Sequence, residues 1–145
     1  MDQDTDWKIN LKALDKQRMT LLMIKDDQVL FTSNRHGMEA LVELLAANRD
    51  NLVGTTVVDR VVGTAAAKLL LWQHVRRIDA LVASRRAVEL LRHSGVVFNF
   101  KELVPELVDR KTGETDRFEL MSVKHDYAES FYQILTQDLL TFRNE

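Results

Sequence analysis

At 145 residues the chain fits one domain that can bury a single core without disulfides or metal ions. It contains no cysteine, which excludes disulfide frameworks, thiolate nucleophiles and zinc–thiolate sites. The 20 Lys and Arg residues nearly balance the 22 Asp and Glu residues, so nucleic acid is not an expected partner.

The apolar runs of the sequence do not predict a membrane protein. The longest, 40–47 and 61–72, are too short or too interrupted to span a bilayer. The start, MDQDTDW, lacks the basic and apolar regions of a signal peptide. We therefore expect a soluble, cytoplasmic protein with no membrane partner, built as a single domain over residues 1–145.

The first segment predicts a short helix. Asp6 can cap it, and Trp7, Leu11 and Leu14 recur on one face. Because the pattern changes near Met19, we interpret residues 1–18 as a helical extension that precedes the core.

A hairpin and a second helix follow. The β-rich runs TLLMI (20–24) and VLFT (29–32) flank the polar stretch KDDQ, which is typical of a hairpin. Apolar residues then recur at helical spacing and predict a helix at about 35–47, with Ser33 or Asn34 as its cap.

The stretch VVDRVVGTAAAKLLLW predicts a buried strand that leads into a buried helix. Thr55–Val58 is apolar on both faces, as in the middle of a sheet. After Asp59, the expected cap, the helix is apolar nearly all round, with Arg60, Thr64 and Lys68 as one narrow polar line.

The next segment repeats this alternation. Residues 78–83 predict a strand, Ser84 caps the following helix, Gly95 ends it, and VVFNF (96–100) predicts another strand. Alternating strands and helices with short connections require right-handed crossovers. We therefore expect an α/β fold with three layers, α/β/α, around a mixed, mostly parallel sheet of about five strands.

The last third contains fewer signals. Residues 101–117 hold the only proline and a glycine turn, which indicates an irregular surface segment. Asp126 and Glu129 have the spacing of a capping box and predict a C-terminal helix over 126–143 that packs on the sheet. Its apolar face comprises Tyr127, Phe131, Ile134, Leu135, Leu139 and Phe142.

Three stretches of the core resemble a known family. VVDRVVGTAAAKLL, IDALVASRRAVELLRHSGVVF and KELVPELV are similar to the bacterial domain-of-unknown-function family DUF1893, and Ser33 and Gly37 match its Ser-x-x-x-Gly loop. The resemblance implies a cytidine deaminase-like fold over residues 19–110.

Zinc-dependent deamination is not expected from these residues. That chemistry needs His-x-Glu or Cys-x-Glu at one helix start and Pro-Cys-x-x-Cys at the next. Here the two starts read Asp59-Arg-Val-Val-Gly63 and Ala83-Ser84-Arg85, and the four histidines lie in unrelated segments. We predict no metal site and no cofactor.

The two helix starts nevertheless predict a ligand site. They open at the carboxyl ends of parallel strands, where free amides and the helix dipole favour an anion. We expect a small anionic metabolite or a nucleotide to contact Ser33, Asp59, Arg60, Gly63, Thr64, Lys68, Ser84 and Arg85.

Several of these residues also have a purely structural interpretation. Asp59 and Ser84 can be helix caps, Gly63 can serve close helix–sheet packing, and Lys68 can be a solvated side chain.

Three functions remain open at this point. The first is non-catalytic binding of the small ligand. The second is a metal-independent enzyme with Asp59 as general base and Lys68 or Arg60 stabilising negative charge. The third is an interaction protein that forms a homo-dimer through exposed apolar residues of its terminal helices.

Overall fold

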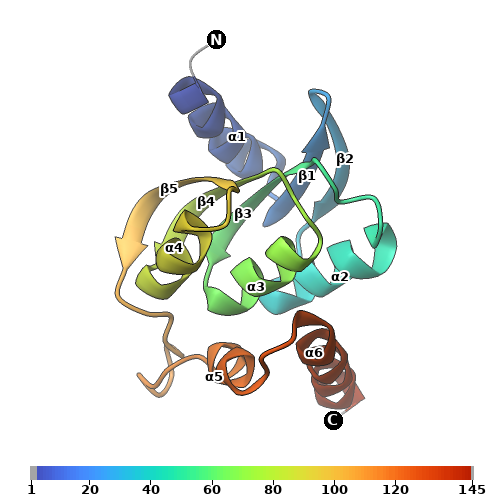
Figure 1. Ribbon diagram of the computed structural model, residues 1–145, viewed down its shortest axis with the longest axis vertical. Helices are drawn as coiled ribbons and strands as arrows, with labels where there is room; N and C mark the ends of the chain where they lie inside the picture. The colour runs from blue at the N-terminus through green and yellow to red at the C-terminus, as the bar shows by residue number, and fades with distance from the viewer. Residues whose placement is uncertain (1–2, 145) are drawn as a thin grey trace.

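The computed structural model describes residues 3–144, which form a five-stranded sheet with helices on both faces (Figure 1). In chain order the elements are α1 (Gln3–Gln17), β1 (Leu21–Lys25), β2 (Gln28–Ser33), α2 (Met38–Asn48), β3 (Thr56–Val62), α3 (Thr64–Trp72), β4 (Arg77–Ser84), α4 (Arg85–Arg92), β5 (Val97–Val104), α5 (Arg117–Lys124) and α6 (Ala128–Asn144). None of the helices in this described part has the length and apolar character that crossing a bilayer requires.

The strand order is β2-β1-β3-β4-β5. β1 pairs antiparallel with β2 and with β3, whereas β3, β4 and β5 are parallel. The prediction of an α/β fold with a mixed sheet of about five strands is confirmed, with the parallel part confined to β3–β5.

The turn between β1 and β2 forms the predicted hairpin. Lys25 pairs with Gln28, which leaves Asp26 and Asp27 as a two-residue loop. Both have positive φ, 51° and 63°. Two consecutive left-handed residues are typical of the tight turn whose twist matches antiparallel strands, and aspartate tolerates that conformation.

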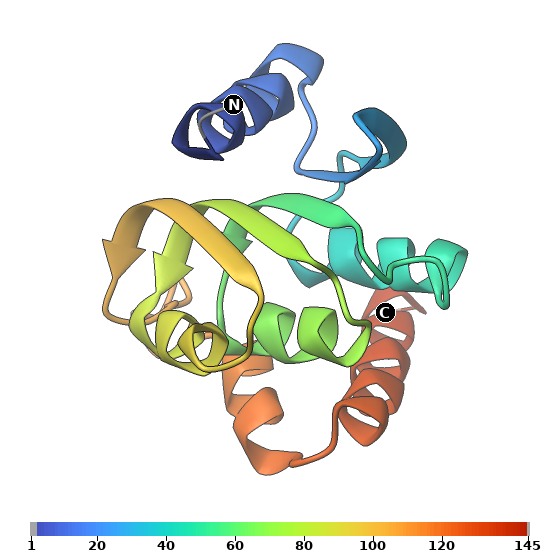
Figure 2. The ribbon, with the colours of Figure 1, turned by 45° about the horizontal axis from the view of Figure 1, so that its top comes forward.

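Figure 2 shows the layers from the side. α1 lies on one face of the sheet, while α2, α3 and α4 lie on the other. α5 and α6 pack beyond α3, on the side away from the sheet. The three predicted layers are therefore present, and two further helices extend the second helix layer outward.

The two faces of the sheet carry separate apolar clusters. Under α1, Leu11 and Leu14 pack on Leu22 and Val58. The larger cluster joins the opposite face to α2, α3, α4 and α6, and contains Leu41, Leu44, Val57, Leu69, Ile78, Phe131 and Leu135 among others. The expectation that the C-terminal helix packs on the sheet is wrong, because α6 packs on α3 and α5.

The strand β3 continues four residues beyond the predicted end. Val61 and Val62 still pair with Val82 and Ala83 of β4, so the ladder extends past Asp59. Asp59 is therefore not the cap of α3. It lies within the strand, opposite Leu21 of β1 and Ala80 of β4.

Three other predicted caps are wrong. Asp6 lies inside α1, which begins before it, at Gln3. Gly37, not Ser33 or Asn34, precedes α2, and it makes no side-chain cap. The Ser33 hydroxyl instead accepts a hydrogen bond from the Arg35 amide within the preceding turn. At α6 the Tyr127 carbonyl accepts from the Phe131 amide, so Tyr127 rather than Asp126 precedes the helix. The side chain of Phe142, predicted on the apolar face, lies outside the described residues.

The segment expected to be irregular contains regular structure at both ends. β5 runs to Val104, and α5 begins at Arg117, which leaves 105–116 without a helix or strand. Asp116 caps α5, since its carboxylate accepts hydrogen bonds from the amides of Phe118 and Glu119. This helix contributes Glu119 to the site described below.

Candidate functional site

A cleft of about 1190 Å³ lies at the carboxyl ends of β3, β4 and β5, on the face covered by α2 and α3. Its walls are the loop 34–37, the start of α3, the segment 106–110 and the first turn of α5. Small-molecule sites occupy about 300–1,000 Å³, so the cleft is large enough for a metabolite.

Asp59 lies in the wall formed by the sheet. Side chains alternate along a strand, and Val57 faces the main core whereas Val58 faces α1. Asp59 consequently points toward the cleft, and Arg60 toward α1. Burial raises the pKa of the Asp59 carboxyl to about 7, and hydrogen bonds from the amides of Val61 and Arg60 partly offset this effect. With a pKa of about 7, the Asp59 carboxyl can exchange a proton near neutral pH.

The start of α3 is occupied by a carboxylate from α5. Glu119 accepts hydrogen bonds from the amides of Thr64, at 2.8 Å, and Ala65, at 2.7 Å. These bonds satisfy two of the amide donors that every helix start leaves unpaired, and they place a negative charge at the positive end of the helix dipole. The amides that we expected to bind a ligand anion are thus bound to Glu119.

Gly63 makes this contact possible. Its φ is −104°, which any residue adopts, so backbone freedom is not the reason for a glycine. A Cβ on Gly63 would lie 2.0 Å from the Glu119 carboxylate oxygen Oε1 and 2.5 Å from Leu107 Cδ1. A residue with a Cβ at this position would force the Glu119 carboxylate or the Leu107 side chain to shift.

Glu119 itself is nearly inaccessible, at 8% exposure. Burial raises the pKa of its carboxyl, and the neighbouring Asp116 adds to this effect. The two amide hydrogen bonds and the guanidinium of Arg86 act in the opposite direction. The pKa therefore lies above its ordinary value even though the carboxylate is hydrogen-bonded.

The start of α4 has a local cap. The hydroxyl of Ser84, which is 2% exposed, accepts a hydrogen bond from the Ala87 amide at 3.2 Å. The predicted cap is confirmed. Thr64 and Ser84 both border a small cavity of about 40 Å³, together with Arg86 and Glu119. The two helix starts therefore converge as predicted, but Glu119 lies at their junction.

Three of the eight predicted site residues bind other parts of the protein instead. Arg60 donates to the Asp15 carboxylate and to the Met19 carbonyl on the α1 side. Lys68 Nζ donates to the carbonyls of Ser122, at 2.6 Å, and His125, at 2.7 Å, at the end of α5. Ser33 is buried in its turn.

The remaining predicted residues differ in their access to the cleft. Asp59 and Gly63 line it. Thr64 and Ser84 line the adjoining small cavity, and Arg85 is exposed and lines neither.

Residues that the sequence reasoning missed include Glu119 and the loop 34–37. One signal for Glu119 was available, because Asp116 and Glu119 have capping-box spacing and predict a helix start. No local sequence pattern predicts that the Glu119 side chain contacts α3, which lies 55 residues earlier in the chain. Arg86, beside the residue Arg85 that we selected, was also missed.

The charge of the cleft is mostly negative. Six carboxyl groups line it, one of them Asp59 with a pKa of about 7, against three arginines. Of those arginines, Arg35 pairs with Glu43, and Arg117 pairs with Asp138. The lining therefore offers few cations to an anionic ligand. Within the part of the chain that the structure describes, no three His, Asp or Glu side chains are grouped so that they could hold a metal ion.

Comparison with known proteins assigns the family. The family model described as "TM1506: Domain of unknown function (DUF1893)" matches residues 9–139. The chain belongs to the DUF1893 family. The resemblance inferred from the sequence is thereby confirmed.

A solved DUF1893 structure agrees over almost the whole chain. The DUF1893 protein TM1506 of Thermotoga maritima has a TM-score of 0.80 at 28% identity, over 95% of this chain and 92% of that one. Among curated protein sequences, none matches this chain significantly.

Structures of two other proteins show partial likenesses to this DUF1893 chain. RibD of Acinetobacter baumannii has a TM-score of 0.49 at 17% identity, over 68% of this chain and 35% of that one. The apo dCMP deaminase of cyanophage S-TIM5 has a TM-score of 0.47 at 11% identity, over 72% of this chain and all of that one.

Proposed function

We propose that the protein binds a small polar molecule carrying N–H donors, uncharged or cationic, in the cleft beside Asp59. The single observation that carries this proposal is the Asp59 carboxyl, which faces the cleft with a pKa of about 7. Depending on its protonation, such a group accepts a hydrogen bond from an N–H donor or donates one to a ring nitrogen or carbonyl.

The contacts of the cleft favour this ligand class over the anion expected from the sequence. The amides of Thr64 and Ala65 are bound to Glu119, and Arg60 and Lys68 are engaged elsewhere. The surplus of carboxylates repels an added negative charge. A nucleoside, which lacks the phosphate, retains the nucleotide-like part of the prediction. Its base would pack against the apolar side chains of Met38, Val61 and Val82, which line the cleft.

A thermal-shift titration with matched ligands tests the proposal. Nucleosides, their 5′-monophosphates, simple amines and inorganic phosphate are compared, because nucleoside and monophosphate differ only by the anion. We expect the nucleoside or the amine to raise the Tm with concentration and phosphate to have no effect. Asp59→Asn should weaken binding about tenfold, whereas Arg60→Ala, which alters the α1 side, should not. No shift across the panel, or equal shifts in Asp59→Asn, would overturn the proposal.

The pH dependence of stability gives a ligand-free check on Asp59. Its folded pKa, about 7, exceeds the ordinary value of 3.8, so the folded state binds more protons between these values. Stability should therefore fall as the pH rises from about 4 to about 7, by at most about 4 kcal/mol. Asp59→Asn should remove the part of this dependence that Asp59 contributes and stabilise the protein at pH 8, while Glu119, whose pKa is also raised, keeps its own contribution. Urea denaturation across this range measures both effects, and a wild-type profile identical to that of the variant would contradict a buried, titrating Asp59.

A metal-independent enzyme is the second candidate, because a carboxyl with a pKa of about 7 suits a general base. The version with Lys68 or Arg60 stabilising negative charge lacks support, since both side chains bind elsewhere. Turnover of a bound ligand that is lost in Asp59→Asn, with the fold intact, would favour this candidate.

The third expectation, a homo-dimer, stays a prediction. Light scattering against concentration tests it, and a strict monomer at high concentration would reject it.

A further inference from the structure

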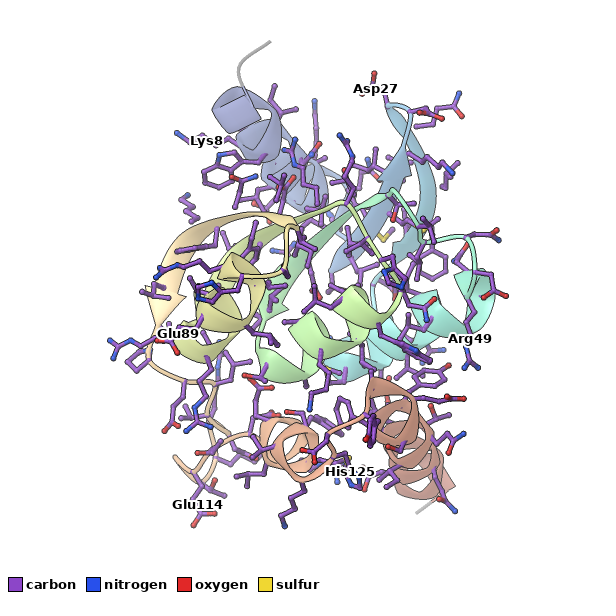
Figure 3. The ribbon with its side chains drawn as sticks, in the orientation of Figure 1. Lys8, Asp27, Arg49, Glu89, Glu114 and His125 are labelled. Atoms are coloured by element: carbon purple, nitrogen blue, oxygen red, sulfur yellow. The ribbon has the colours of Figure 1, made fainter. Side chains whose placement is uncertain are left out.

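The helix α5 forms one wall of the cleft, and irregular chain flanks it on both sides. Its first turn, with Asp116, Phe118 and Glu119, lines the cleft. The segment 105–116 precedes it, and residues 125–127 connect it to α6. Figure 3 shows His125 between α5 and α6, and Glu114 pointing outward from the segment before α5.

The burial pattern of α5 is the reverse of that in most packed helices. Its buried residues are polar, Glu119 and Ser122. Two of its aliphatic side chains, Leu120 and Val123, are 50% and 56% exposed. Burial of apolar surface is the main force that fixes a helix to its neighbours. In α5 only the partly buried Phe118 and Met121 contribute to the core.

Polar contacts at its two ends attach α5 to α3. In the first turn the Glu119 carboxylate binds the amides of Thr64 and Ala65. At the last turn Lys68 Nζ binds the carbonyls of Ser122 and His125. Both contacts involve the first two turns of α3, so four hydrogen bonds to one short segment hold α5 against α3. The ion pair between Arg117 and Asp138 also joins α5 to α6.

We propose that α5 is a lid on the cleft, which opens as a unit when the Glu119 and Lys68 contacts to α3 break. Opening frees the start of α3 and one wall of the cleft, while the sheet and α2 to α4 keep their packing. The significance of this motion rests on the proposed ligand site, because the lid would control entry to it. The motion itself does not depend on any ligand.

Amide hydrogen exchange of the full chain without ligand tests the lid. We expect the amides of 117–124, and those of Thr64 and Ala65, to exchange at least 100-fold faster than the amides of β4, since they exchange through local opening. Glu119→Gln and Lys68→Met should each accelerate exchange in these segments at least tenfold, and these segments should stay at least 100-fold faster than β4. Glu114→Gln is the matched control, because this exposed side chain precedes α5 and points away from α3.

A thiol reporter tests access to the cleft by a second route. The chain has no cysteine, so Ala66→Cys places a single thiol at a cleft residue that is 3% exposed. Alkylation should be at least tenfold faster when Glu119→Gln is added, and unchanged when Glu114→Gln is added.

Two outcomes would overturn the lid. The first is exchange of α5 at the same rate as β4 in the wild type and both variants. The second is exchange of α5 that neither variant accelerates, which would show that the Glu119 and Lys68 contacts do not hold the helix closed. Because neither experiment uses a ligand, a failed ligand screen leaves these results interpretable, and a fixed α5 leaves the ligand proposal standing.

Discussion

The first turns of α3 and α4 both lie at the carboxyl end of a parallel strand, and their amides have no acceptor within the helix. The two sets of amides bind different kinds of acceptor elsewhere. At α4 the acceptor is Ser84, the residue directly before the helix. At α3 it is Glu119, which is contributed by α5 and lies 55 residues away. The difference shows that a residue motif at a helix start does not reveal whether the amides are available to a ligand.

The two caps also differ in what each requires from the surrounding structure. A serine cap requires only a local turn. The carboxylate cap requires a buried charge, a glycine that leaves space for it, and a neighbouring helix that holds it in position. Substitutions at the two helix starts should therefore have effects of very different size.

The largest effect should come from Gly63→Ala. Because the new Cβ would overlap with Glu119 and Leu107, we expect a loss of about 3–4 kcal/mol, from overpacking and from the displaced carboxylate. Urea denaturation measures it. Adding Glu119→Ala removes one of the two overlapping side chains, so the cost of Gly63→Ala should become smaller in that background. Strict additivity of the two substitutions would contradict the steric explanation.

Glu119→Gln should have the next largest effect. The amide group can accept from one of the two helix amides but presents a donor to the other, which leaves a buried N–H unpaired. We expect a loss of about 2 kcal/mol. The exposed Glu114→Gln should change the free energy of unfolding by less than about 0.5 kcal/mol. Equal effects of the two substitutions would show that the carboxylate cap contributes nothing.

A smaller effect is expected for Ser84→Ala. Loss of a serine cap typically costs about 1 kcal/mol, and here the Ala87 amide loses its acceptor. The matched control is Ser130→Ala, since that exposed hydroxyl only donates to the Tyr127 carbonyl. If Ser84→Ala costs more than Glu119→Gln under the same conditions, the proposed ranking of the caps is wrong.

The smallest effect should come from Arg86→Met. The Arg86 side chain connects the two helix starts, because it belongs to α4 and acts on Glu119 at the start of α3. Arg86 lies in the first turn of α4 and lowers the pKa of Glu119. Its removal should raise that pKa further while changing stability by less than about 0.5 kcal/mol. The pH titration of the Thr64 and Ala65 amide resonances reports the change. Arg85→Met, on the neighbouring exposed residue, should leave the titration unaltered, and an equal shift in both variants would exclude a specific contact.

The sequence by itself determined the α/β class, the hairpin, the alternating strands and helices between β3 and β5, and the cap at Ser84. These features depend on hydrophobic period, turn residues and contacts within a few positions, which are local properties of the chain. The family was also recognisable from short stretches between Val57 and Val108.

Only the tertiary structure decided which predicted site residues face the cleft. The extension of β3 through Val62 depends on pairing with β4, and it moves Asp59 from a helix cap to a strand position facing the cleft. The same alternation turns Arg60 toward α1. The closure of α3 by Glu119 and the contact of Lys68 with α5 join residues more than 50 positions apart. Such contacts arise from the packing of whole elements, and no periodicity or local motif encodes them.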